Sequence, residues 1–228
     1  MNVVHLCDCM DFMKGVPDKF YNISLTDPPY NVGIEYNSHF DKMDNYESWC
    51  DSWFNELLRI SETVVITTGY RNLKYWVNKN PKGIIYWIKA NQNSPSQLGG
   101  FNCVEHIFYF GKLQKRIGQD YFSMPIGVQA DASFHPVPKY LPAWKKLLIM
   151  VSNKNSTIFD PFVGSGTTRI ACHDIGLDFE GCEIDKDYWE AQEARYKQHI
   201  SQGDLFSNEE MQKAIYQDTQ LGLLDTSE

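Results

Sequence analysis

Short apolar runs rich in β-branched residues alternate with longer segments of helical periodicity along most of this 228-residue chain. This alternation is typical of an α/β fold, a mostly parallel sheet with helices on both faces. Ligands of such sheets bind beyond the carboxyl ends of the strands, where the strand order reverses. Strands are predicted at Val3–Leu6, Asn22–Thr26, Thr63–Thr68, Gly83–Lys89, Val104–Phe110, Thr157–Asp160 and Phe179–Glu183. Helices are predicted at Tyr46–Ile60, Asn72–Asn78, Pro138–Ser152, Thr167–Ile175 and Lys186–Gln198.

The segment TDPPYN, residues 26–31, directly follows one of these expected strands. It places a carboxylate, two prolines and a tyrosine at a carboxyl end, where ligands bind. Proline fixes the backbone φ angle and has no N–H group, so Pro28 and Pro29 would present nearby acceptors rigidly. The alternative is that Asp27 to Tyr30 form an ordinary turn.

A second unusual stretch is FDPFVGSGTTRIA, residues 159–171. Its glycines, Gly164 and Gly166, would let the backbone turn sharply and approach a ligand, and the helix that follows begins at Thr167. About 20 residues beyond the loop, Glu183 ends another strand, where an acid can accept hydrogen bonds from ribose hydroxyls. The stretch lacks both the lysine of a nucleoside-triphosphate loop and the third glycine of a dehydrogenase fingerprint. We therefore expect a cofactor with a ribose but no phosphates, although a plain strand-to-helix turn would also explain the glycines.

The combination of DPPY with D-P-F-x-G-S-G-T-T resembles the amino-methyltransferases of DNA, which use S-adenosylmethionine. DPPY precedes the glycine loop, an order similar to the β class of that family, in which the two halves are swapped along the chain. Further similar segments are Cys7-Asp8, IIYWIKANQNSP at 84–95, EHIFYF at 105–110 and HPVPK at 135–139. In the last segment the family usually continues with proline, whereas this chain has Tyr140.

The resemblance implies a Rossmann-like S-adenosylmethionine-dependent methyltransferase fold, with a seven-stranded sheet, one antiparallel strand and a circularly permuted motif order. It also implies that Glu183 contacts the ribose, that Asp8 contacts the adenine edge, and that the 135–139 segment contacts the methionine end. The cofactor-binding residues it implies are Asp8, Asp27, His135, Lys139, Asp160, Phe162, Gly164, Ser165, Gly166, Thr167, Thr168 and Glu183.

The chemistry expected of DPPY follows from the weak nucleophilicity of an exocyclic base amine, whose lone pair is delocalised into the ring. Asp27 and the Pro28 carbonyl could accept hydrogen bonds from the two N–H groups of this amine and so localise the lone pair on nitrogen, while Pro29 stiffens the turn. Tyr30 could stack on a base rotated out of the duplex. The methyl group would pass directly to nitrogen, without a metal or a covalent enzyme intermediate. The sequence has no proline-cysteine loop of the kind that methylation of a ring carbon would need, so attack on cytosine C5 is disfavoured.

The resemblance favours adenine N6 as the target, because aspartate is commoner in the adenine enzymes and serine in the cytosine-N4 enzymes. Cytosine N4 is the alternative. A second alternative, from another functional class, is a catalytically silent binding subunit that keeps the cofactor fold.

Net charge is −8 for the whole chain, but it is unevenly distributed. The segment from residue 200 onward carries −5, which leaves −3 on residues 1–199 and room for a local basic face. We expect residues 1–199 to be the catalytic domain, residues 111–134 a small target-recognition insertion, and residues 200–228 an acidic tail. Within the insertion, Lys112, Lys115 and Arg116 are candidate phosphate contacts, unless they lie on a solvated hairpin tip.

The remaining features bear on partners and location. The chain has no apolar run long enough to span a bilayer, no secretory signal at its start and no metal-ligand spacing among its six cysteines. These observations favour a cytoplasmic protein of a bacterial or phage-infected cell that acts on DNA, alone or in a restriction-modification pair. A homodimer would compensate for the small recognition region. The segment Gln202–Phe206 resembles peptides that dock on the replication sliding clamp, although its apolar pair could instead fold back on the sheet.

Overall fold

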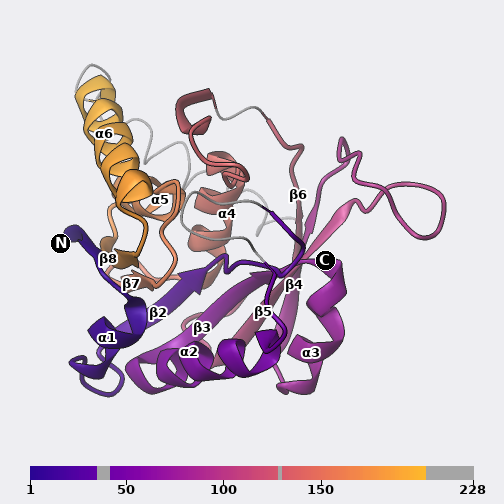
Figure 1. Cartoon of the computed structure of the whole chain (residues 1–228), viewed down its shortest axis with the longest axis horizontal. Coiled ribbons are helices and arrows are strands. Elements are labelled where there is room, and N and C mark those ends of the chain that lie inside the picture. Colours follow the sequence, from indigo (N-terminus) through magenta and orange to yellow (C-terminus); the bar gives the residue numbers. More distant parts are fainter. Residues whose placement is uncertain (35–41, 128–129, 204–228) are drawn as a thin grey trace, which may run out of the picture.

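A computed structural model describes residues 1–34, 42–127 and 130–203 of the chain. Within these ranges one sheet of eight strands crosses the molecule (Figure 1). The strands are β1 (Asn2–Leu6), β2 (Tyr21–Thr26), β3 (Ser61–Thr68), β4 (Gly83–Ile88), β5 (Val104–Gly111), β6 (Tyr121–Ser123), β7 (Thr157–Asp160) and β8 (Asp178–Glu183). All seven predicted strands are present.

The spatial order of the strands is β1-β8-β7-β2-β3-β5-β4-β6. Every neighbouring pair is parallel except β3–β5 and β4–β5, so β5 alone runs against the others. The mostly parallel sheet with one antiparallel strand is therefore confirmed. The predicted number of seven strands is wrong, because β6 adds a short edge strand beside β4. Its three residues are too few to show a period in the sequence.

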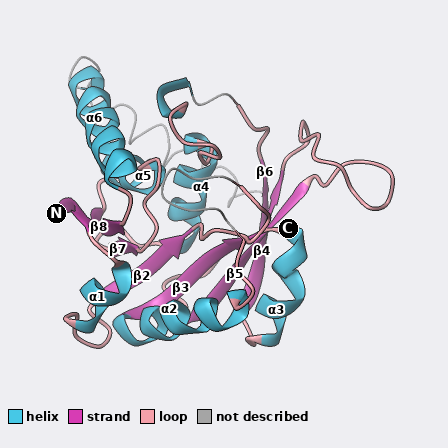
Figure 2. Ribbon diagram, in the orientation of Figure 1, coloured by secondary structure: helices cyan, strands magenta, loops and turns pink. Residues whose placement is uncertain are grey.

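The helices cover both faces of the sheet (Figure 2). One face carries α1 (Cys9–Lys14), α2 (Tyr46–Ile60) and α3 (Leu73–Asn78), and the other carries α4 (Leu141–Val151), α5 (Thr167–Asp174) and α6 (Lys186–Gly203). Short 3-10 turns lie at Tyr70–Asn72 and Ala130–Ala132. Each face has its own apolar core, centred on Trp53 and Trp76 on the first face and on Trp144 and Leu147 on the second.

Helix α1 was not predicted from the sequence. It has only six residues, too short for a periodic pattern, but Asp8 caps it, accepting a hydrogen bond from the Met10 N–H at 2.8 Å. Aspartate is a favoured N-cap residue because its side chain satisfies a backbone donor at the start of the helix.

Strand order reverses between β2 and β7, which are neighbours in space although far apart in sequence. Asp27 follows the end of β2, and Asp160 is the last residue of β7. The Thr26 hydroxyl donates to the Asp160 carboxylate at 2.8 Å and joins the two strand ends. The two unusual sequence stretches thus meet at the topological switch point, where ligands bind in sheets of this type.

The reversed direction of β5 sends its two flanking loops to opposite edges of the sheet. Val104 pairs with Ile88 at the carboxyl end of β4, so the loop of residues 89–103 emerges at the same edge as Asp27. At the other end of β5, Gly111 pairs with Thr63 near the start of β3, at the opposite edge.

In the described part of the chain no helix is long and apolar enough to cross a membrane. Helix α6 extends further than predicted and ends at Gly203. Most of the acidic tail, including Leu205 and Phe206, lies outside the described residues. The sliding-clamp peptide therefore stays a prediction.

Candidate active site

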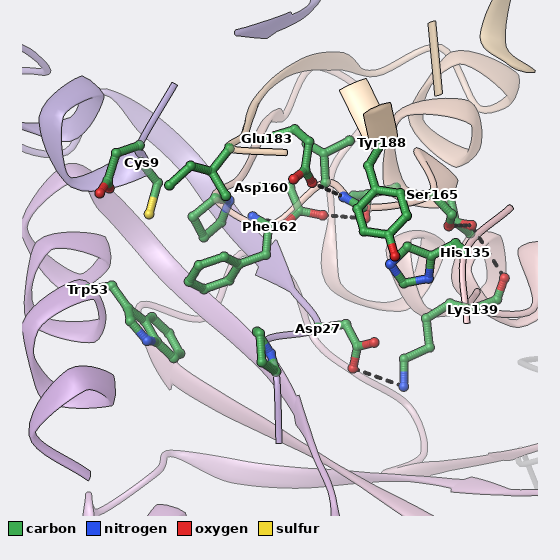
Figure 3. Close-up of a pocket in the computed structure, with 18 of the residues that line it drawn as sticks. Cys9, Asp27, Trp53, His135, Lys139, Asp160, Phe162, Ser165, Glu183 and Tyr188 are labelled. Atoms are coloured by element: carbon green, nitrogen blue, oxygen red, sulfur yellow. Dashed lines mark hydrogen bonds and ion pairs between the residues drawn. The ribbon is translucent and has the colours of Figure 1, made fainter. Parts of the chain in front are cut away.

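A cavity of about 550 Å³ lies at the switch point, open along the carboxyl ends of β1, β8, β7 and β2 (Figure 3). Most of the site residues expected from the sequence line it. They are Asp8, Asp27, Pro29, His135, Lys139, Asp160, Phe162, Gly164, Ser165, Thr167, Thr168 and Glu183. The structure thus gathers residues from both halves of the chain around one space, whereas Pro28, Tyr30 and Gly166 are not among the lining residues.

Asp160 anchors the floor of the cavity. Only 2% of its surface is exposed, and its two oxygens accept hydrogen bonds from the hydroxyls of Thr26 at 2.8 Å and Thr168 at 2.6 Å. The Phe162 N–H donates a third at 3.0 Å. Burial raises the pKa of Asp160 to about 6, even though these donors favour the ionised form. A carboxylate held in so unfavourable an environment is typical of a functional site.

Glycine is required in the loop that follows Asp160. Gly164 has a φ angle of +51°, and a Cβ atom there would lie 2.9 Å from Nε2 of His135. Gly166 has a φ angle of +79°, and a Cβ atom there would lie 3.1 Å from Cβ of Gln192. These positions favour glycine both for backbone conformation and for space. The glycine pattern seen in the sequence therefore reflects a tight loop packed under the His135 ring.

Glu183 faces the same loop. One of its oxygens accepts the Gly164 N–H at 2.7 Å and the other accepts the Asp185 N–H at 2.9 Å. Burial raises the pKa of Glu183 above its usual range. Nearby, burial lowers the pKa of His135 to about 4, so this imidazole is neutral at neutral pH. This end of the cavity thus combines the Glu183 carboxylate, a hydrogen-bond acceptor, with the uncharged imidazole of His135.

Asp27 receives several donors at the other end of the cavity. Its Oδ1 atom accepts hydrogen bonds from the hydroxyls of Tyr30 and Thr67, and it lies 2.9 Å from the Lys139 ammonium. Figure 3 shows the Asp27 and Lys139 side chains pointing toward each other. In the described part of the chain all of these contacts are made with Oδ1, so the Oδ2 atom can still accept a hydrogen bond.

The backbone carbonyls that follow Asp27 also differ in whether they already accept a hydrogen bond. The Pro29 carbonyl accepts a hydrogen bond from the Tyr46 hydroxyl at 2.8 Å, and the Tyr30 carbonyl accepts one from Asn72 at 2.7 Å. The Pro28 carbonyl accepts none from the described residues. Asp27 and Pro28 therefore offer one carboxylate oxygen and one carbonyl as adjacent acceptors.

Lys139 belongs to a buried chain of ion pairs that the sequence did not reveal. Its ammonium lies 2.7 Å from Oε1 of Glu105, whose other oxygen lies 2.7 Å from the Lys89 ammonium. Burial alone would lower the pKa of Lys139, but Asp27 and Glu105 raise it well above its usual range. Lys139 and Lys89 in turn hold the pKa of Glu105 low despite its burial. The chain therefore keeps a positive charge fixed beside Asp27.

Aromatic side chains form a wall that sequence reasoning missed. Trp49 and Trp53 of α2 belong to or pack against the core on that face of the sheet, and both also line the cavity and pack on Phe162, with ring centroids 5.6 and 5.3 Å away. Tyr188 lies opposite, 5.0 Å from the His135 ring. A helix that is half buried shows the same spacing whether its apolar face meets the sheet or a ligand, so the pattern cannot distinguish the two.

A buried arginine also supports the loop without any signal in the sequence. Arg195 of α6 donates to the Ser165 carbonyl at 2.8 Å and to the Thr167 hydroxyl at 3.0 Å.

The three basic residues of the predicted recognition region are not brought to this site. Lys112 pairs with Glu62 at 3.0 Å, and the Lys115 ammonium donates to the Ile149 carbonyl near the end of α4. Together with the exposed Arg116, they follow β5 at the edge of the sheet opposite Asp27. Their expected role in holding nucleic acid next to the site is not supported by this position.

No cluster of three His, Cys, Asp or Glu side chains that could hold a metal occurs in residues 1–34, 42–127 and 130–203. All six cysteines lie in these ranges and are free.

Comparisons with known proteins agree with this geometry. A family model described as DNA methylase matches residues 114–194. The chain is 24% identical over 220 residues to the type II methyltransferase M.HpaI of Haemophilus parainfluenzae, covering 80% of this chain and 70% of that protein. It is 21% identical to M1.MboII of Moraxella bovis, covering 82% of this chain and 94% of that protein.

Solved structures share the fold. The complex of M1.HpyAVI with S-adenosylmethionine superposes with a TM-score of 0.61 at 21% identity, over 86% of this chain and all of that one. The cytosine-N4-specific PvuII DNA methyltransferase gives a TM-score of 0.67 at 14% identity, over 86% of each chain. The fold is therefore the Rossmann-like fold of S-adenosylmethionine-dependent methyltransferases. With Asp27, Pro29 and the glycine loop joined in one cavity, the family model, the type II methyltransferase relatives and the shared fold together support a DNA amino-methyltransferase, specific for adenine N6 or cytosine N4.

Proposed function

We propose that the protein transfers a methyl group from S-adenosylmethionine to the exocyclic N6 of adenine in DNA. One observation carries the proposal. A single cavity joins Asp27, the carboxylate of the proposed acceptor pair, to the acid and glycine loop that suit a ribose-bearing cofactor. A catalytically silent binding subunit would not need the acceptor pair.

The lining residues fit S-adenosylmethionine. A volume of about 550 Å³ is in the usual range of about 300–1,000 Å³ for small-molecule sites. Glu183 would accept the ribose hydroxyls, and Phe162 and Ile184 would pack against the adenine, with Asp8 at its edge. The methionine end would lie toward His135 and the Ser165–Thr168 loop, where a substituent on Gly164 would fill the space.

When bound, the cofactor supplies an electrophilic methyl group on a sulfonium, which leaves as a neutral thioether. The protein's part is to prepare the nitrogen. Oδ2 of Asp27 and the Pro28 carbonyl accept hydrogen bonds from the two amine N–H groups, which localises the lone pair on nitrogen. The ion pair with Lys139 holds the Asp27 carboxylate in place. The same carboxylate is the nearest base for the proton that the nitrogen loses after it is methylated.

Aspartate in the DPPY segment supports adenine as the target. The fold does not distinguish the two bases, since the cytosine-N4-specific PvuII enzyme shares it. The alternative is therefore a cytosine-N4 methyltransferase with the same acceptor pair.

The test is to incubate the purified protein and S-adenosylmethionine with unmethylated bacterial DNA, digest the DNA to nucleosides and identify the product by mass spectrometry. N6-methyladenine is the expected product, and N4-methylcytosine would establish the alternative. Sequencing the methylated DNA at single-base resolution then gives the recognised site.

Asp27→Ala provides the control. Methylation should be abolished, while the affinity for S-adenosylmethionine, measured by calorimetry, should stay within about tenfold, or about 1.4 kcal/mol. Binding of the cofactor without methylation of any DNA by the unaltered protein would favour a silent binding subunit instead.

A further inference from the structure

A hairpin of residues 89–103, here called the finger, projects from the edge of the sheet where Asp27 lies (Figure 1). Backbone hydrogen bonds close it at three levels. Lys89 N–H donates to the Cys103 carbonyl at 2.7 Å, Asn102 N–H to Ser94 at 2.9 Å, and Ser96 N–H to Gly100 at 2.8 Å. The finger is therefore an ordered structure with a defined tip.

The base of the finger is fixed to the active site. The Asn91 side chain makes two hydrogen bonds of 2.7 Å to the backbone of Ile126, one as donor and one as acceptor. Lys89 pairs with Glu105, which pairs with Lys139, which pairs with Asp27. Three ion pairs thus connect the base of the finger to the catalytic carboxylate.

The tip presents apolar side chains to solvent. A turn from Ser96 to Gly99, with Gly99 at a φ angle of +83°, places Leu98 at the apex. Leu98 is 96% exposed, more than any other large hydrophobic residue in the described ranges, and Phe101 is 61% exposed. Leu98 adds nothing to the core, and together with Phe101 it gives the tip an apolar surface.

The charge and polarity of the finger suit nucleic acid. Residues 90–104 contain no charged side chain in a chain of net charge −8. A finger without carboxylates can approach a polyanion without repulsion. Its flanks carry carboxamides, among them Asn93 and Gln97, and such groups can pair with the edges of bases in a groove.

The base of the finger also lies at a suitable distance from the strand that leads to Asp27. Strand β4, which leads into it, is three positions from β2 in the sheet, or about 14 Å at the usual strand spacing. That is close to the roughly 12 Å width of the major groove. A duplex whose target base reaches Asp27 would therefore lie against the finger.

We propose that the finger enters duplex DNA and that Leu98 occupies the stack beside the extruded base. The inference rests on the proposed function, because it takes the target base to be rotated into the cavity. Apolar wedges inserted between base steps offset the energy of unstacking, and a base that is already unpaired costs less to extrude. Leu98 is thus assigned to base extrusion, apart from methyl transfer itself.

The experiment compares Leu98→Ser with Leu113→Ser. Leu113 is 42% exposed on the opposite edge of the sheet, so it is a matched control for loss of an exposed leucine. Single-turnover methylation is measured on two oligonucleotide duplexes carrying the mapped site, one fully paired and one with the target base mispaired. Leu98→Ser should lower the rate at least about tenfold on the paired duplex and less than about twofold on the mispaired one. Leu113→Ser should change neither rate.

Equal losses on both duplexes, no loss on either, or the same loss with Leu113→Ser would overturn the proposal. A second measurement does not depend on catalysis. A photo-crosslinking amino acid at position 98 should attach to duplex DNA, and the same group at position 113 should not. If the unaltered protein methylates no DNA, the proposed function fails, but crosslinking still decides whether the finger contacts the duplex. Crosslinking from neither position, or equally from both, would refute the contact.

Discussion

At the scale of single residues, the Tyr30 hydroxyl has a clearer role in the structure than in the sequence. The sequence suggests only that its ring stacks on a base. In the structure the hydroxyl donates to Asp27 and lies 3.0 Å from the Thr67 hydroxyl and 3.2 Å from the Lys139 ammonium. Tyr30 therefore also positions the Asp27 carboxylate.

Tyr30→Phe separates these two roles. It keeps the ring but removes a buried hydrogen bond, so the single-turnover methylation rate should fall about tenfold with cofactor affinity unchanged. Tyr30→Ala should lose a further 1–3 kcal/mol or so of stacking, seen as weaker DNA binding. A Tyr30→Phe variant as fast as the unaltered protein would leave stacking as the residue's only role.

Asp160 makes the stability of the fold depend on pH. Burial raises its pKa from 3.8 to about 6, so the folded state holds this proton more tightly than the unfolded chain does. Between these pH values the unfolded chain releases the proton first, and this carboxyl group therefore destabilises the fold progressively as pH rises.

Asp160→Asn cannot titrate. The unaltered protein should therefore lose stability relative to this variant as pH rises from about 4 to about 7. The difference between their free energies of unfolding should change in favour of the variant by up to about 3 kcal/mol. Urea unfolding of both proteins at a series of pH values measures this difference. The other titrating groups are the same in both proteins, so their contributions cancel. A difference that does not change with pH would show that Asp160 titrates normally.

At the scale of elements, the loop between β7 and α5 depends on Gly164. Gly164→Ala would place a Cβ atom against His135 in a left-handed conformation that costs alanine about 1–2 kcal/mol. The affinity for S-adenosylmethionine should fall at least about tenfold by calorimetry. Gly83→Ala is the control, because a Cβ atom there meets nothing within 4 Å. Equal effects of the two substitutions would argue against the tight loop.

The position of the segment after β5 and its sequence lead to different expectations for the salt dependence of DNA binding. From the sequence alone, each lost phosphate contact should reduce the salt dependence of DNA binding by nearly one unit of slope. Because Lys112 and Arg116 lie opposite the site, replacing both with alanine should leave that slope unchanged. Fluorescence anisotropy over a range of salt concentrations tests this, and a flatter slope would place DNA on that edge.

Prediction from sequence succeeded where a signal is local. The β-branched runs located seven strands, and DPPY and the glycine loop located both halves of the cavity. It failed where the signal is a tertiary pairing. Nothing near Glu105 in the sequence indicates that it lies between Lys89 and Lys139, because that depends on the register of β4 and β5. The direction of β5, which decides the edge on which each flanking loop lies, is likewise a property of the whole sheet.

At the scale of the whole molecule, the charge distribution affects how tightly the protein holds DNA. Residues 204–228 carry a net charge of −5, against −3 for the rest. Removing these residues should tighten DNA binding about threefold to tenfold near 50 mM salt, and the gain should vanish at high salt, where charges are screened. Affinities of the full and shortened chains at both salt concentrations provide the test. A gain that persists at high salt would mean that the tail acts by some means other than charge.

The reversal of β5 also affects how a protein of this design can change the part that is proposed to enter DNA. Since the two ends of the finger meet at the paired residues Ile88 and Val104, the hairpin can lengthen, shorten or be replaced without shifting any strand. The acceptor pair and the cofactor cavity lie on other connections, so they need not change with it. In the proposed arrangement, the part that enters the DNA and the part that carries out the chemistry are then separately inherited parts of one chain. A hairpin grafted from another protein of the same topology should change the rate on a fully paired duplex while leaving the methyl-transfer step on a mispaired one intact.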